Sequence, residues 1–432
     1  PAPDDEALFM ANADDYVRKI RRHPCMALYC GRNEGMPPAS LDAALRSLTA
    51  SLHPDILYIS HSSRGLVSGE GPYRRLPSSE YFTLRGQDRM HSERGVTGLP
   101  NFESMVRFMP SVDLWPQNDM WGVHDWGLEN AQRPGDYTGA VISRFGDPGS
   151  ARRFSELAQW VSYDAFRAVF EGRSSERRGL LLWMSHNAWP SLVWCPYDYY
   201  FDPHAGFFAC KKACEAVHIQ YNAVSGKVEV VNMSAGDLTG LSASATVLDM
   251  YGRELSRQEF GLDSHEDSTF EGPAVELPSG SVSFLRLALN GPSCSDCAGG
   301  LLSENFYVLG DPEDDFRALL DLPKASVKCK WTVSDEDLKY VVDVELQNLS
   351  DVPAMMLRLN LLNNRPVNSG PAPSGLCTSE PQADDYRILP AEWTDNYFHL
   401  MPGESRHVRI TVDKLHFDTA LKPRVELSGF NL

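Results

Sequence analysis

In two short stretches of the sequence an expected strand ends on a carboxylate, and a glycine follows within two residues. In the first, the run CMALYC at 25–30 leads into Asn33 and Glu34. In the second, RMHSERG at 89–95 leads to Glu93. Glycoside hydrolysis requires two carboxylates, one as proton donor and the other as nucleophile or base. Either stretch alone is equally compatible with an ordinary strand-to-helix loop that exposes a glutamate, so the hypothesis depends on the pair.

The elements around these carboxylates alternate between short apolar runs and helical patterns. We expect helices where apolar residues recur every three or four positions, at 5–22, from Pro37 to about 52, and at about 150–171. We expect buried parallel strands at 25–30, 56–60, 67–73, 88–95 and 179–184. Strands that alternate with helices predict βα units and a parallel sheet. The two carboxylates would then lie at the carboxyl end of that sheet, the face that carries chemistry in β/α barrels.

The sequence pattern changes after about residue 221. Segments such as KVEVVNM, SATVLDMYG and SVSFLRLALNG alternate or run apolar between turn residues, without helical periodicity. This pattern is typical of antiparallel β-sandwiches. Residues 293–302 are small and polar, which predicts a linker, and a second β-rich region follows from 303.

Composition excludes some classes of function. The chain has 432 residues, which predicts two to four domains, and a formal net charge of −18. That charge argues against nucleic acid or an anionic membrane surface as the main partner, and no apolar run is long enough to span a bilayer. The nine cysteines include one CxxC, Cys294 to Cys297, for which free thiols or a local disulfide are better interpretations than zinc. Because the sequence opens directly on a helix, it leaves the compartment unknown.

Four segments together resemble glycoside hydrolase family two. They are GRNE at 31–34, HSERGVTGLPNFESM at 91–105, the aromatic-rich segment from GLLLWMSHNAWPS to HIQYN at 179–222, and ILPAEWTDNYFHLMPGE at 388–404. The resemblance is to the branch of exo-β-D-glucosaminidases and mannosylglycoprotein endo-β-mannosidases, and it covers the carboxy-terminal portion of those enzymes.

The resemblance implies a multidomain fold. Residues 1–221 would form strands four to eight of a partial (β/α)8 TIM barrel, and residues 222–292 and 303–432 would form two immunoglobulin-like β-sandwich domains. Strands one to three would be missing, so a missing amino-terminal part or a companion subunit would complete the barrel. The implied partner is an oligosaccharide or glycan substrate, and no cofactor or metal is implied.

The resemblance also assigns roles to residues. Glu34 would be the acid/base and Glu93 the nucleophile of a retaining β-glycosidase that acts on β-mannosides or β-glucosaminides. Asn33 would hold the sugar 2-substituent. Five aromatic or histidine side chains are further candidates for substrate contact, although each is also compatible with a place in the core: Tyr73, Trp121, His124, Trp189 and Trp393.

Two departures from the family pattern matter. Some glucosaminidases of this branch use Asp as the acid, so Glu34 favours a mannosidase-like or other β-glycosidase activity over a glucosaminidase. Arg94 follows the expected nucleophile where the family has an apolar or aromatic residue, and a cation there would favour an ionised carboxylate. A different class of function also stays open, in which the chain is a non-catalytic carbohydrate-binding or structural remnant of such an enzyme.

Overall fold

The computed structural model describes residues 2–84, 89–127, 134–176, 178–291, 300–363, 387–416 and 423–432. Cys294 and Cys297, the CxxC pair, lie outside these ranges. The chain divides into two compact units. The first comprises Pro1–Pro72, Leu84–Gly95 and Arg178–Trp183, and the second comprises Tyr73–Thr83, Val96–Arg177 and Met184–Leu432.

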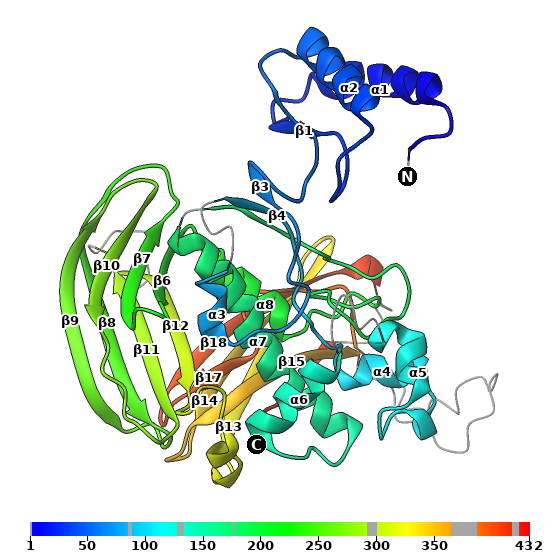
Figure 1. Ribbon diagram of the computed structural model, residues 1–432. Helices are drawn as coiled ribbons and strands as arrows, with labels where there is room; N and C mark the ends of the chain where they lie inside the picture. Colours follow the sequence, from blue (N-terminus) through cyan, green and yellow to red (C-terminus); the bar gives the residue numbers. More distant parts are fainter. Residues whose placement is uncertain are drawn as a thin grey trace. The chain divides into compact units, whose positions relative to one another are not determined.

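The first unit contains the predicted alternation of helices and parallel strands (Figure 1). Its elements are α1 (Glu6–Ile20), β1 (Leu28–Cys30), α2 (Ala39–Leu52), β2 (Leu57–Ile59), β3 (Val67–Ser68), β4 (Met90–Arg94) and β5 (Leu180–Leu182). β1 pairs with β2, and β4 pairs with both β3 and β5, in each case in parallel. These pairings confirm the prediction of a parallel arrangement.

The prediction that these strands are buried on both faces is wrong for several residues. Leu181 in β5 is 55% exposed, Trp183 just after it is 41% exposed, and Leu57 at the start of β2 is also exposed. The physical reason is that the parallel pairing forms two small sheets, of two and three strands, rather than one broad sheet. Most of these strands therefore lie at the edge of a small sheet.

The second unit contains the remaining helices. These are α3 (Ser78–Tyr81), α4 (Phe102–Phe108), α5 (Asp119–Trp121), α6 (Pro134–Phe145), α7 (Ala151–Ser175) and α8 (Ala205–Ala213), with shorter turns at Ser111–Asp113, Gly122–Trp126, Arg317–Asp321 and Lys414–His416. Ser150 caps α7 by accepting the backbone N–H of Arg153. The apolar face predicted for this helix is confirmed, because the following side chains are all buried: Phe154, Leu157, Val161, Ala165 and Val169.

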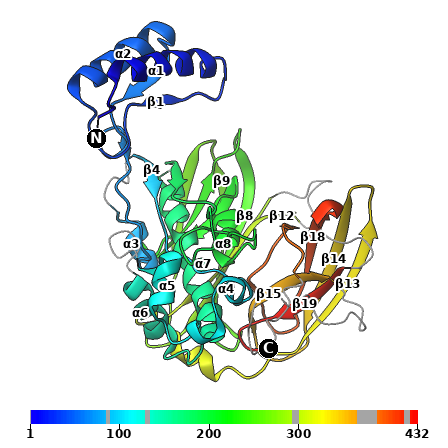
Figure 2. The same ribbon diagram turned by 90° about the vertical axis from the view of Figure 1, so that its right-hand side faces the viewer.

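Two antiparallel sheets follow, and apolar side chains from both form one core, among them Val228 and Leu285. Their strands are β6 (Val217–Tyr221), β7 (Lys227–Asn232), β8 (Leu238–Asp249), β9 (Glu254–Ser264), β10 (Ser268–Ala274), β11 (Ser283–Asn290) and β12 (Leu301–Leu309). The strand orders are β10-β7-β6 and β12-β11-β8-β9. Figure 2 labels β8, β9 and β12 of the larger sheet. β12 includes residues that the sequence assigned to the second β-rich region, and it pairs with β11 of the first.

The last part of the chain forms a further pair of antiparallel sheets. Its strands are β13 (Val327–Asp335), β14 (Lys339–Asn348), β15 (Ala354–Asn363), β16 (Glu392–Trp393), β17 (Phe398–Leu400), β18 (Ser405–Asp413) and β19 (Pro423–Ser428). They are ordered β13-β14-β18-β16 and β17-β15-β19. Alternating buried residues of β14 and β18, such as Val342 and Ile410, fill the space between these sheets. The antiparallel β-rich organisation predicted for the carboxy-terminal half is therefore observed.

Candidate active site

Glu34 lies in the loop that follows β1. Its backbone has a positive φ of 52°, which is uncommon for a residue other than glycine. The Glu34 N–H donates to the hydroxyl of Ser62 at 2.9 Å, and that hydroxyl donates to Oδ1 of Asn33 at 3.1 Å. Ser62 therefore holds the backbone of one candidate catalytic residue and the side chain of its neighbour.

Glu93 lies within β4, next to Ser92. The Ser92 hydroxyl donates to the backbone carbonyl of Ser62 at 2.7 Å. Gly69 packs against this bond so closely that a Cβ at that position would overlap both the Ser62 carbonyl and the Ser92 hydroxyl. Ser62 thus contacts Glu34 through its hydroxyl and, through its carbonyl, Ser92, the residue before Glu93.

The sequence analysis did not single out Ser62, although a signal was present. His61, Ser62 and Ser63 follow β2 in the way that polar residues follow β1 and surround Glu93. The same pattern of an apolar strand followed by polar residues therefore marks all three positions. Arg94 is buried, and its Nη2 lies 3.4 Å from Nε2 of His91.

In the second unit, two of the predicted substrate contacts lie together. The rings of His124 and Trp189 stack with centroids 5.3 Å apart. Nε1 of Trp189 donates to Oδ2 of Asp125 at 3.0 Å, and Nδ1 of His124 lies 2.8 Å from the carbonyl oxygen of Pro190. Trp189 is 43% exposed, so its ring forms an accessible surface that neighbouring groups hold in place.

The other predicted aromatic contacts have different surroundings. Trp121 is only 1% exposed, and its ring packs edge-on against Trp126 while its Nε1 donates to the carbonyl of Asp113. Trp393 is also buried, and its carbonyl accepts from Nζ of Lys211 on α8. The ring of Tyr73 lies 6.1 Å from that of Trp194 in an edge-on arrangement. Contact of these three residues with a sugar stays a prediction.

Two further features are absent from the described part of the chain, a metal-binding cluster and a membrane-spanning helix. No group of three or more His, Cys, Asp or Glu side chains there has an arrangement that could bind a metal ion. None of the helices in the same ranges combines the length and apolar character needed to cross a bilayer.

Comparison with known proteins identifies relatives over almost the whole chain. Residues 305–372 and 378–432 match the family of the exo-β-D-glucosaminidase Ig-fold domain. The mannosylglycoprotein endo-β-mannosidase of Lilium longiflorum is 26% identical, over 99% of this chain and 54% of that protein. An exo-β-D-glucosaminidase of Streptomyces avermitilis is 27% identical, over 96% of this chain and 48% of that protein.

Solved structures show a similar fold. The exo-chitosanase CsxA of Amycolatopsis orientalis superimposes with a TM-score of 0.83 at 21% identity, over 100% of this chain and 54% of that one. The β-D-mannosidase of Dictyoglomus thermophilum superimposes with a TM-score of 0.73 at 18% identity, over 99% and 51%. The chain spans about half the length of the curated relatives named above. Its sequence is thus similar over most of its length to exo-β-D-glucosaminidases and to a mannosylglycoprotein endo-β-mannosidase, and its carboxy-terminal part matches the Ig-fold domain of the exo-β-D-glucosaminidases.

Proposed function

We propose that this chain carries both catalytic carboxylates of a retaining β-glycosidase, with Glu93 as nucleophile and Glu34 as acid/base. The observation that carries the proposal is the pair of hydrogen bonds that Ser62 accepts, one from the backbone N–H of Glu34 and one from the hydroxyl of Ser92 beside Glu93. Both glutamates belong to the same compact unit. Each follows or ends a short parallel strand, as expected for residues at the carboxyl end of a sheet.

The proposed reaction is a double displacement. The Glu93 carboxylate attacks the anomeric carbon while the Glu34 carboxyl group transfers its proton to the departing glycosidic oxygen. A covalent glycosyl ester on Glu93 results, and Glu34 is left as a carboxylate. Glu34 then removes a proton from water, whose oxygen attacks the anomeric carbon and releases Glu93. This chemistry requires the two carboxyl groups to lie about 5–5.5 Å apart in the working enzyme.

Further residues contribute to substrate binding in this proposal. Asn33 would hold the sugar 2-substituent, with its side chain already oriented by the Ser62 hydroxyl. Trp189 would present its ring to the apolar face of a pyranose, since its ring is accessible and its Nε1 is fixed by Asp125. The substrate class is β-mannosides or β-glucosaminides, in keeping with the activities for which the relatives are named. A glutamate at the acid position favours the mannosides.

The proposal includes a preceding segment or companion subunit that completes a β/α barrel. Apolar side chains of the first unit support it, because large ones at strand ends are exposed to solvent in this chain. They include Met36, Leu57, Leu66, Leu181 and Trp183. If the chain acts alone, the same exposed side chains favour the second candidate function, a non-catalytic carbohydrate-binding or structural remnant, because the barrel then stays incomplete.

Kinetics of the nucleophile variant test the proposal. Glu93→Ala in the longest natural form of the protein should abolish turnover of an aryl β-mannoside and an aryl β-glucosaminide. Azide should restore part of that turnover and yield a glycosyl azide of inverted configuration, because a small anion can enter the space of the lost carboxylate. If parent protein binds these glycosides without turning them over, the non-catalytic function is correct. If Glu93→Ala retains parental turnover, Glu93 is not the nucleophile.

A further inference from the structure

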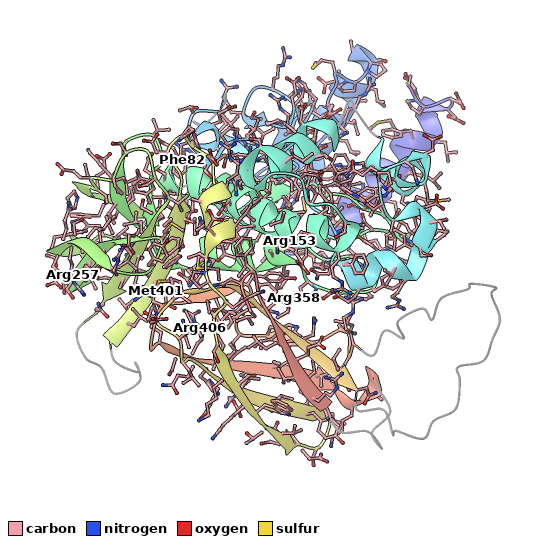
Figure 3. All side chains as sticks on the ribbon, turned by 90° about the horizontal axis from the view of Figure 1, so that it is seen from below. Phe82, Arg153, Arg257, Arg358, Met401 and Arg406 are labelled. Carbon is pink, nitrogen blue, oxygen red and sulfur yellow. The ribbon has the colours of Figure 1, made fainter. Side chains whose placement is uncertain are left out.

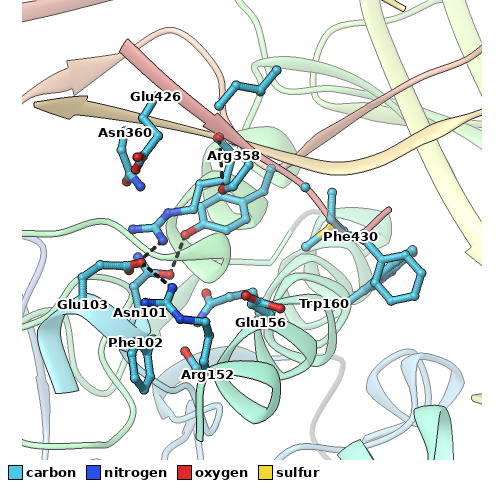
Figure 4. A pocket seen from close by; sticks show the side chains of 17 residues that line it. Asn101, Phe102, Glu103, Arg152, Glu156, Trp160, Arg358, Asn360, Glu426 and Phe430 are labelled. Atoms are coloured by element: carbon cyan, nitrogen blue, oxygen red, sulfur yellow. Dashed lines mark hydrogen bonds and ion pairs between the residues drawn. The ribbon is translucent and has the colours of Figure 1, made fainter. Parts of the chain in front are cut away.

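A cavity of about 330 Å³ lies inside the second unit, where α4 and α7 face β15 and β19 (Figure 4). Its walls combine two arginines, three glutamates, amides, hydroxyls and four aromatic side chains. Figure 3 shows Arg153 and Arg358 where the helices of the second unit meet the strands of its last pair of sheets. None of the candidate catalytic or substrate residues named above lines this cavity.

One wall of the cavity is a polar strip on the paired strands β15 and β19. Arg358 is the register partner of Ser428, and Asn360 is the register partner of Glu426. Register partners in an antiparallel pair, and residues two apart on one strand, project from the same face of the sheet. The four side chains therefore form one polar patch, whereas the intervening Leu359 is buried in the core.

Asn360 is the reason to regard this patch as a binding site. The residue is only 7% exposed, yet its carboxamide makes no hydrogen bond with any part of the chain that the structure describes. Its side chain points into the cavity beside Glu426 (Figure 4). Glu426 likewise forms no ion pair with a described residue. The Asn360 amide and the Glu426 carboxylate can therefore exchange hydrogen bonds with a ligand that enters the cavity.

The opposite wall is already paired and therefore rigid. Glu103 on α4 bridges Arg358, at 2.9 Å, and Arg152 on α7, at 3.3 Å. The hydroxyl of Tyr397 donates to Oδ1 of Asn101 at 2.7 Å. These contacts fix the distance between the helical wall and the sheet, and they leave the Asn360 and Glu426 groups for a ligand.

The chemistry of the cavity selects a class of ligand. An amide, a hydroxyl and guanidinium groups can exchange hydrogen bonds with several hydroxyls of one small molecule. Two arginines against three glutamates give the lining one net negative charge, and Glu426 is the carboxylate without a cation. We propose that this cavity binds a small polyhydroxylated ligand that carries one protonated amine, which pairs with Glu426 while its hydroxyls contact Asn360. An amino sugar belongs to this class of ligand. The choice of an amino sugar as the probe rests on the proposed function, whereas the argument from the cavity does not.

Calorimetric titration of the whole chain with D-glucosamine and D-glucose, under mildly acidic conditions, tests the site. D-glucosamine should bind more tightly than D-glucose by about fivefold or more, because only its amine can pair with Glu426. Glu426→Gln should remove that preference, and Asn360→Ala should weaken both sugars. Glu392→Gln, an equal change of charge at an exposed carboxylate outside the cavity lining, is the matched control and should leave binding unchanged.

Two results would overturn the inference. One is equal affinity for D-glucosamine in the parent and in Glu426→Gln, and the other is the absence of any binding by the parent. Glu426 is exposed, so its replacement leaves the fold intact and keeps the test valid even if Asn360→Ala unfolds. If D-glucosamine instead binds only at the proposed catalytic site, Trp189→Ala removes it and Glu426→Gln does not. If Glu93→Ala loses turnover but still binds D-glucosamine in this cavity with the parental affinity, the cavity and the proposed catalytic site are independent of each other.

Discussion

The backbone N–H of Glu34 donates to the hydroxyl of Ser62, although the two residues are 28 positions apart. The bond joins the loop after β1 to the loop after β2, which are neighbours because those strands pair in parallel. The same serine accepts the Ser92 hydroxyl through its carbonyl, so its position affects both candidate catalytic residues. The first prediction follows from this relationship.

Ser62→Ala should lower kcat of the natural protein by about tenfold or more. The loop that holds Glu34 loses its hydrogen bond to the Ser62 side chain, and a small displacement of a catalytic group lowers the rate of the chemical step strongly. KM should change less, because the substitution leaves Trp189 in place. Steady-state kinetics on an aryl β-mannoside measures both constants. Ser51→Ala, on the exposed side of α2, is the control. Equal kcat in the two variants would mean that Ser62 does not position Glu34.

Glu34→Ala should affect substrates according to their leaving groups. Aryl glycosides with acidic phenols need little protonation and should retain most of the rate of glycosyl-enzyme formation, whereas alkyl glycosides should lose about 100-fold or more. A series of aryl and alkyl glycosides measures this dependence as the slope of rate against leaving-group pKa. A slope that stays as shallow as in the parent would assign the acid role to another residue.

Asp125 should control substrate affinity through Trp189. Asp125 has a positive φ of 72° and accepts the Trp189 indole N–H. Asp125→Ala removes that acceptor and should raise KM about threefold to tenfold, with a smaller effect on kcat, because a binding surface contributes equally to ground and transition states. Asp125→Asn tolerates the same backbone conformation and keeps an acceptor, so it should restore the parental KM. If Asn and Ala raise KM equally, the hydrogen bond does not set the ring orientation.

Arg144 should contribute far more to stability than an exposed arginine at the same distance from its partner. Arg144 lies 2.6 Å from Asp164, also contacts Asp314, and has a side chain that is 1% exposed. Arg144→Met should reduce the free energy of unfolding by about 2–4 kcal/mol, because two largely buried carboxylates each lose one of their two cations and keep only Arg167 or Arg75. Arg253 is also 2.6 Å from its partner, Asp249, but is 74% exposed, and Arg253→Met should cost less than about 1 kcal/mol. Denaturant titration of both variants makes the comparison, and equal losses would contradict it.

The Glu103 carboxylate should make stability depend on acid pH. Burial of Glu103 opposes its charge, but Arg358 beside it prevails and lowers its pKa to about 2. Because the pKa is lower in the folded protein, the stabilisation is present above the unfolded-state pKa of about 4.3 and disappears as pH falls towards about 2. Above pH 5 it amounts to about 2–3 kcal/mol, after allowance for partial exposure of the side chain.

Glu103→Gln should therefore be less stable than the parent near neutral pH and should approach it as the pH falls from about 5 to about 3. Denaturant unfolding at a series of pH values measures this difference. Glu254→Gln, at an exposed carboxylate, serves as the control and should show no such convergence. A difference between Glu103→Gln and the parent that stays constant across this range would show that the ion pair with Arg358 does not set the pH dependence.

Local sequence was sufficient for several elements and for their type. Helical spacing of apolar residues from Phe154 to Val169 identified α7, because one face of an amphipathic helix must be buried. The apolar run before Glu34, and the polar residues and glycine that end the stretch at Glu93, indicated two parallel strands, since a strand and the polar residues at its end are adjacent in sequence. The resemblance to glycoside hydrolases also came from contiguous motifs, and the comparisons confirm it.

Tertiary structure decided the contacts between distant segments. The bond between Ser62 and Glu34 depends on the pairing of β1 with β2, and the cavity at Asn360 depends on the register of β15 against β19. The burial of Trp121 and the exposure of Trp189 likewise depend on which neighbours cover each ring. A single sequence shows residue type and local period, but burial and distance are properties of packing between segments that lie far apart in the chain. Composition therefore determined which chemistry was available, and packing determined which groups meet.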